Sequence, residues 1–146
     1  MAANLRSEKG ASEFLPQQRI SQMYEFKSGI RIGVIGLTTI FTPDTTNAFK
    51  QKLFPEYKFL NYTDIVITES KKLKKNGANA VLIVAHVGND CTVGNKYGKW
   101  TVDTKQEECG VQDEISKLID SLPDGTVDGV LQGHRHKFAH HFYKGK

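Results

Sequence analysis

Two groups of histidines follow short apolar runs and have the residue types of a metal site. His86 comes directly after the apolar residues 80–85, and His134 and His136 follow residues 127–131 in the sequence Gln-Gly-His-Arg-His. Neutral imidazole is a common ligand of zinc, iron and manganese-type ions, and carboxylates usually complete such sites. The pattern therefore indicates metal ligation. The alternative is that these are loop histidines whose ring nitrogens bond to backbone groups.

The elements that must position these histidines predict an α/β fold. Residues 30–37 are rich in β-branched side chains, and they read as a strand together with the apolar runs 80–85 and 127–132. Residues 61–76 and 112–122 repeat apolar positions at the spacing of amphipathic helices. Strand, helix and strand in succession form βαβ units with parallel strands. Ligands of such sheets bind at the carboxyl ends of the strands, where His86 and His134 stand.

The remaining segments are predicted less sharply. Residues 20–26 suit one short helix or one extended piece, and residues 43–60 suit a long connection with a short helix around residues 47–53. The polar stretch 89–110 is long for a loop inside a domain, which favours a functional loop or an insertion. Trp100 within it is interpreted as a packing anchor, with stacking on a substrate as the alternative.

Carboxylate ligands to accompany the histidines are not evident. The aspartates fall in predicted loops or helices, and the sequence contains no HExxH, Walker A or GxSxG motif. His140 and His141 are adjacent in a strand-like segment, so alternation would send their side chains to opposite faces, and they are interpreted as structural. By its own residues the chain therefore holds half of a metal site.

Size and charge fit one ordinary globular domain. The chain has 146 residues, a net charge of +4, 38% hydrophobic and 25% charged residues, and no apolar run or leader typical of a membrane span or signal peptide. The lysines within residues 71–75 are interpreted as the solvated face of a helix. A nucleic-acid surface is the alternative, although no RNA motif or recognition helix accompanies them. Cys91 and Cys109 are compatible with a disulfide or with two free thiols.

Residues 33–39 (Gly-Val-Ile-Gly-Leu-Thr-Thr), the strand ending in Ala-His-Val-Gly at residues 85–88 and Gly-His-Arg-His at residues 133–136 resemble a known family. In that order they are similar to the second half of the calcineurin-like metallophosphoesterase domain, especially that of 5'-nucleotidases and 2',3'-cyclic phosphodiesterases. The resemblance covers nearly the whole chain. It implies two packed sheets flanked by helices and a centre of two divalent ions of zinc, manganese or iron type.

The same resemblance implies a role for each histidine and an incomplete site. His86 and His134 match ligands of one ion, and His136 matches a ligand of the other. Arg135 replaces a small hydroxyl residue that is common between the two histidines. The family's Asp-x-His, Gly-Asp-x-x-Asp and Gly-Asn-His-Glu motifs, which supply the bridging aspartate and catalytic histidine, are absent. No catalytic residue is therefore assigned in this chain.

The resemblance gives two expectations for function. One is a fragment, residues 1–146, of a hydrolase that acts on nucleotides or other phosphoesters, without the family's upstream half and its C-terminal nucleotide-binding domain. The other is an inactive remnant or interaction module that binds metal weakly or not at all. The family is often extracellular, periplasmic or at the cell surface, but the chain carries no targeting signal that decides its compartment.

Overall fold

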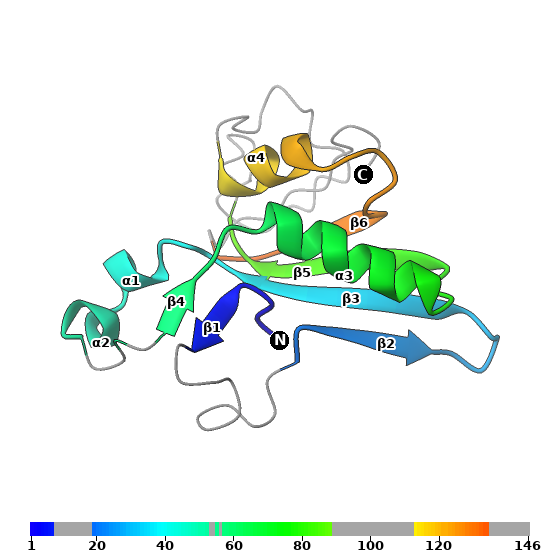
Figure 1. Ribbon diagram of the computed structural model, residues 1–146, viewed down its shortest axis with the longest axis horizontal. Coiled ribbons are helices and arrows are strands. Elements are labelled where there is room, and N and C mark those ends of the chain that lie inside the picture. Colours follow the sequence, from blue (N-terminus) through cyan, green and yellow to red (C-terminus); the bar gives the residue numbers. More distant parts are fainter. Residues whose placement is uncertain (8–18, 53–54, 56, 89–112, 135–146) are drawn as a thin grey trace, which may run out of the picture.

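The computed structural model describes residues 1–7, 19–52, 55, 57–88 and 113–134 and confirms an α/β fold (Figure 1). The described strands form a four-stranded sheet of order β2-β3-β5-β6 and a separate pair, β1-β4. In chain order the described elements are β1 (Leu5–Ser7), β2 (Ser21–Glu25), β3 (Arg31–Thr38), α1 (Thr42–Thr45), α2 (Asn47–Lys50), β4 (Tyr57–Phe59), α3 (Thr63–Lys75), β5 (Ala80–His86), α4 (Glu114–Ser121) and β6 (Gly129–Gln132).

The three strands predicted from apolar runs are β3, β5 and β6, and they pair in parallel as the βαβ pattern requires. Helix α3 connects β3 to β5, and α4 lies between β5 and β6 in the chain. Strand β5 includes His86 as its last residue, and β6 ends two residues before His134. The carboxyl ends of β5 and β6 therefore lie side by side at one edge of the sheet.

Helix α3 ends where the sequence predicts. Gly77 has a φ of 90°, a left-handed conformation that glycine adopts without steric cost. The N–H groups of Gly77 and Ala78 donate to the carbonyls of Lys74 and Leu73, both at 3.0 Å, which closes the helix. This tight stop directs the chain straight into β5.

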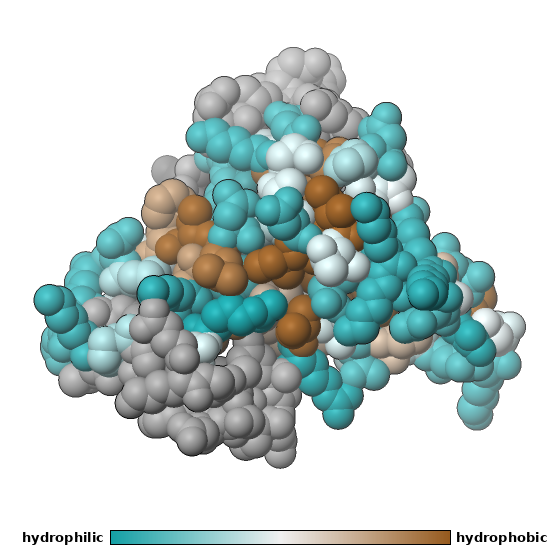
Figure 2. Space-filling view, viewed as in Figure 1, coloured by the Kyte–Doolittle hydropathy of each residue, from teal (hydrophilic) through white to brown (hydrophobic). Residues whose placement is uncertain are grey.

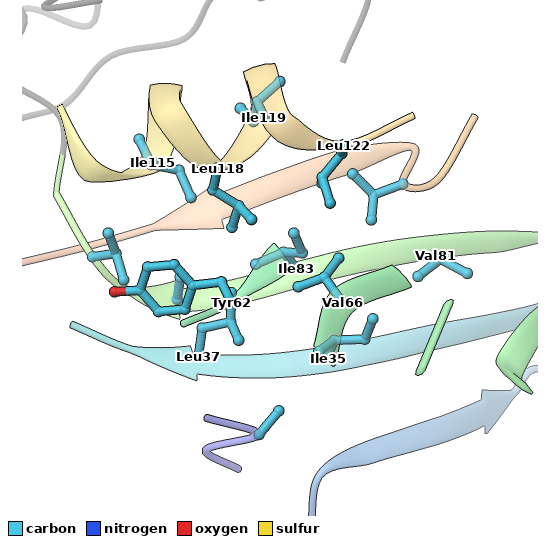
Figure 3. Close-up of a cluster of buried hydrophobic side chains, with 14 of the residues drawn as sticks. Ile35, Leu37, Tyr62, Val66, Val81, Ile83, Ile115, Leu118, Ile119 and Leu122 are labelled. Atoms are coloured by element: carbon cyan, nitrogen blue, oxygen red, sulfur yellow. The ribbon is translucent and has the colours of Figure 1, made fainter. Parts of the chain in front are cut away.

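The hydrophobic core lies between one face of the four-stranded sheet and the two long helices (Figure 3). The sheet contributes Ile35, Leu37, Val81 and Ile83 to this cluster. The helices and their flanks contribute Tyr62, Val66, Leu73, Ile115, Leu118, Ile119 and Leu122. Burial of these side chains is the main stabilising term, and it fixes α3 and α4 on the same face of the sheet.

The outer side of α3 carries the lysines predicted to be solvated, and Figure 2 shows hydrophilic residues along it. Lys71, Lys72, Lys74 and Lys75 are exposed, which confirms that interpretation. Glu69 on the inner side is buried, and its carboxylate accepts a 2.6 Å hydrogen bond from Ser21 of β2 and lies 3.4 Å from the Lys72 ammonium. A buried carboxylate paired in this way ties β2 to α3.

The opposite face of the sheet, called the open face below, carries no charged strand residue and is open only in part: Val34 of β3 is 9% exposed, and a Cβ added at Gly36 would meet Met1. A Cβ added at Gly33 would lie 2.8 Å from Leu73 of α3, so residue 33 faces the helices and residues 32 and 34 face away. The strand registers extend this alternation to every strand. The strand residues on the open face are Gln22, Tyr24, Ile32, Val34, Gly36, Thr38, Ala80, Leu82, Val84, His86, Gly129 and Leu131, and none is Asp, Glu, Lys or Arg.

Of the two alternatives for residues 20–26, the structure confirms the extended one, since β2 pairs antiparallel with β3 from Ser21 to Glu25. The connection 43–60 contains a second short helix, α1, and a strand, β4, besides the expected α2.

No described helix is long and apolar enough to cross a membrane. Trp100, the loop 89–110, both cysteines and His140 and His141 lie outside the described residues, so the predictions for them stay predictions.

Candidate metal centre

His86 and His134 meet at the carboxyl edge of the sheet, as predicted from the strand ends. The Gly133 N–H donates to the Ala85 carbonyl at 3.0 Å, which continues the β5-β6 pairing past the end of β6. His134 follows with a φ of 92°, a left-handed backbone that is uncommon outside glycine. A strained residue of this kind recurs at functional sites, where surrounding contacts hold it in place.

The two imidazoles are in direct contact. His134 Nδ1 lies 3.0 Å from His86 Nε2, within hydrogen-bond distance, and the ring centroids are 4.7 Å apart at an interplanar angle of 76°. Both side chains are exposed, so solvent and ions have access to their nitrogens. One neutral ring donates its N–H and the other accepts, with the roles set by the tautomers.

This geometry fits a pair of ligands on one ion. Zinc binds histidine nitrogen at about 2.0–2.1 Å in a tetrahedral site, so two such nitrogens stand about 3.3 Å apart. His134 Nδ1 and His86 Nε2 lie 3.0 Å apart, which is close to that separation. The donor atoms are of the type that zinc, iron and manganese-type ions accept.

The described residues supply no third ligand. No group of three or more His, Cys, Asp and Glu side chains suited to one ion occurs within them. His136, the predicted ligand of a second ion, lies outside the described residues, so its role stays a prediction. Asp128 precedes β6, but its carboxylate accepts from the Val81 N–H at 2.8 Å and serves the sheet rather than the histidines.

A cluster of hydrogen-bonded side chains, which the sequence did not reveal, is bonded to the main chain of His86. The Glu114 carboxylate at the start of α4 accepts from Thr39 Oγ1 at 2.7 Å, from the Ile40 N–H at 2.9 Å and from the Tyr62 hydroxyl. The Ile40 N–H also lies 3.0 Å from the Tyr62 oxygen. Thr39 in turn donates its N–H to the His86 carbonyl at 3.1 Å.

Tyr62 stays neutral in this cluster. Burial, reinforced by its hydrogen bond to Glu114, raises the pKa of Tyr62 well above its ordinary value. A phenol held neutral beside a carboxylate acts as a donor and not as a base. The cluster therefore joins the loop after β3, the start of α3 and the start of α4 without contributing a nucleophile.

Sequence comparison gives one relative and no family assignment. No profile of a known protein family matches the sequence. A cell wall protein of Listeria monocytogenes (serovar 1/2a) is 30% identical over 112 residues, which cover 76% of this chain and 13% of the Listeria protein. The chain therefore spans a small part of that relative's length.

Solved structures decide the fold. A candidate 5'-nucleotidase of Staphylococcus aureus, solved with alpha-ketoglutarate, superposes with a TM-score of 0.61 over 93% of this chain and 23% of its own, at 17% identity. The calcineurin-like phosphoesterase YfkN of Bacillus subtilis superposes with a TM-score of 0.59 over 93% of this chain and 36% of its own, also at 17% identity. The chain has the fold of a calcineurin-like phosphoesterase. It spans about a quarter to a third of these chains.

Proposed function

We propose that this chain is part of a metal-dependent phosphoester hydrolase. The observation that carries the proposal is the contact between His86 and His134, two imidazoles brought within 3.0 Å at neighbouring strand ends of a phosphoesterase fold. Ligands of α/β sheets bind at this edge, and paired imidazoles are typical metal ligands there. The proposed role of His86 and His134 is to hold one ion, and that of His136 is to hold a second.

Divalent ions held in such a centre would supply charge stabilisation for a phosphate and would lower the pKa of a bound water. The role of this chain in such a centre is to hold the two imidazoles in position. Strand β5 places His86 rigidly at its end, and the left-handed backbone of His134 turns its ring towards His86. Each ring binds through an unprotonated nitrogen, so protonation of either histidine opposes loading of the site.

The proposed substrate class is a 5'-nucleotide or a related phosphoester. This rests on the resemblance of residues 33–39, 85–88 and 133–136, taken together, to 5'-nucleotidases and their 2',3'-cyclic phosphodiesterase relatives, and on the likeness in fold to a candidate 5'-nucleotidase. The net charge of +4 is compatible with an anionic substrate.

The proposal predicts metal-restorable hydrolysis by the complete protein that contains this chain. After chelation and removal of metal, zinc, manganese or iron is expected to restore release of phosphate from nucleoside 5'-monophosphates, because the ions supply the nucleophile and charge stabilisation. Phosphate release is measured for 5'-monophosphates, 2',3'-cyclic nucleotides and p-nitrophenyl phosphate. Failure to hydrolyse any of them with any of the three metals would refute a phosphoesterase function.

The open face favours a second proposal, that these residues form one half of a domain. Parallel strands are nearly always covered on both faces, yet here Val84 of β5 and Leu131 of β6 are 42% and 61% exposed, whereas Val34 of β3 is buried at 9%. The occupant we propose is a second β-sheet of the complete protein, because the solved chains of this fold extend far beyond the matched part. His86 lies on the open face, so that sheet would also border the metal site and bring the missing carboxylates.

This proposal predicts that the isolated 146-residue chain self-associates through the open face. Leu131→Lys is expected to shift the chain towards monomer on size-exclusion chromatography, because a buried lysine opposes apolar contact. Leu60→Lys is the matched control, since Leu60 is also exposed, at 40%, but is not on the open face. A wild-type chain that elutes as a monomer at every concentration, with the circular dichroism of a folded protein, would count against a missing sheet.

A further inference from the structure

The turn that follows β3 is held by a single carboxylate. Both oxygens of Glu114 are occupied: Oε2 accepts from the Thr39 hydroxyl, and Oε1 accepts from the Ile40 N–H and the Tyr62 hydroxyl. Thr39 and Tyr62 are buried, at 4% and 5% exposure. Hydrogen bonds to an ionised acceptor are about twice as strong as neutral ones, and burial strengthens them further.

The turn held by Glu114 is bonded directly to the main chain of His86. Thr38 is the register partner of His86 across the β3-β5 pair, and the next N–H, that of Thr39, donates to the His86 carbonyl at 3.1 Å. On the other side of β5, the Gly133 N–H donates to the Ala85 carbonyl and so extends the pairing between β5 and β6. The end of β5 is thus held between the Thr39 turn and the segment that carries His134.

We propose that Glu114 is a positioning residue for the histidine pair: its carboxylate, assisted by Tyr62, fixes the turn at Thr39 and Ile40, and that turn fixes the backbone from which the His86 ring projects. Three elements far apart in sequence converge on this point, since Glu114 lies 75 residues from Thr39 and 52 from Tyr62. A shift of the turn moves His86 relative to His134, whose own backbone is set by β6. Only the expected effect of Glu114 on metal affinity rests on the proposed metal site; its effect on the contact between the two rings does not.

A purely structural role is the competing explanation, and Glu69 supplies the matched control. Like Glu114, which is half-buried, Glu69 is a carboxylate that joins separate elements; it is buried and links β2 to α3 through a 2.6 Å bond from Ser21, and it lies 3.4 Å from Lys72. Within the described part of the chain, the hydrogen bonds of Glu69 go to Ser21 and Lys72 and not to the turn after β3. Glu69→Gln and Glu114→Gln are therefore both expected to lower the melting temperature, but only the second is expected to disturb the histidines.

The test uses the 146-residue chain with 15N-labelled histidine. Long-range 1H–15N spectra report the tautomer of each imidazole, and a nuclear Overhauser effect between the rings reports the His86–His134 contact without any metal. Glu114→Gln is expected to weaken or abolish that effect, Tyr62→Phe to weaken it less, and Glu69→Gln to leave it intact. An unchanged ring contact in Glu114→Gln, measured well below its melting temperature, would overturn the proposal.

A zinc titration followed by the same spectra separates this proposal from the proposed function. If wild-type chain binds zinc through the pair, Glu114→Gln is expected to bind it about tenfold more weakly, the lower range for groups that orient metal ligands. Equal zinc affinity in the two proteins would count against positioning. If zinc leaves both imidazoles of the wild type unshifted, the metal site is wrong, and the metal-free ring contact still decides the role of Glu114.

Discussion

Replacing His86 and His134 together by alanine in the complete protein is expected to remove about one of two bound ions per molecule. The two imidazoles face each other across 3.0 Å in the described structure, and no third ligand lies among the described residues to hold the ion without them. Loss of groups that merely orient a ligand costs about 10–100-fold in metal affinity, so loss of two ligands is expected to cost more. Metal content is measured by elemental analysis of dialysed protein.

The matched control is the other histidine pair of the chain. His140 and His141 are predicted to be structural, so His140→Ala/His141→Ala is expected to retain both ions. Circular dichroism of each variant excludes unfolding as the cause of metal loss. Undiminished metal content in the His86/His134 variant would remove the assignment of both residues as ligands.

The isolated chain is expected to hydrolyse nucleoside monophosphates at least about a thousandfold more slowly than the complete protein. General acid–base catalysis alone contributes about 10²–10⁴-fold. The sequence lacks both the family's motif for a catalytic histidine and its motifs for a bridging aspartate, so more than that single contribution is lost. Phosphate release under saturating metal is the measurement, with the complete protein assayed in parallel. Turnover by the isolated chain close to that of the complete protein would show that residues 1–146 contain their own catalytic groups.

The central elements of the fold could be predicted because their signals are local. Hydrophobic period and β-branched content identify β3, β5 and β6, and Asn76-Gly77 marks the end of α3. The helical crossover of each βαβ unit then makes the pairing of these strands parallel. The sequence of β2 does not decide between helix and strand, because Ser-Gln-Met-Tyr-Glu has no strong hydrophobic period. Its pairing with β3 decides its conformation, which is a tertiary effect.

Some features of the candidate site could likewise be predicted from the sequence, and others could not. The rule that ligands gather at strand ends predicted that His86 and His134 would converge, and their contact confirms it. The left-handed backbone of His134 could not be predicted, since such a conformation is uncommon for any single residue other than glycine. Glu114 and Tyr62 were hidden for another reason. Each lies at the start of an ordinary amphipathic helix, and nothing local indicates that the two side chains meet.

Anomalous diffraction at the zinc edge from crystals of the complete protein would locate the ion relative to His86 and His134. We expect an anomalous peak about 2.0–2.1 Å from a ring nitrogen of both residues, with the two rings moved from their present 3.0 Å contact. Bound zinc held entirely by other residues, with His86 and His134 still bonded only to each other, would contradict this expectation.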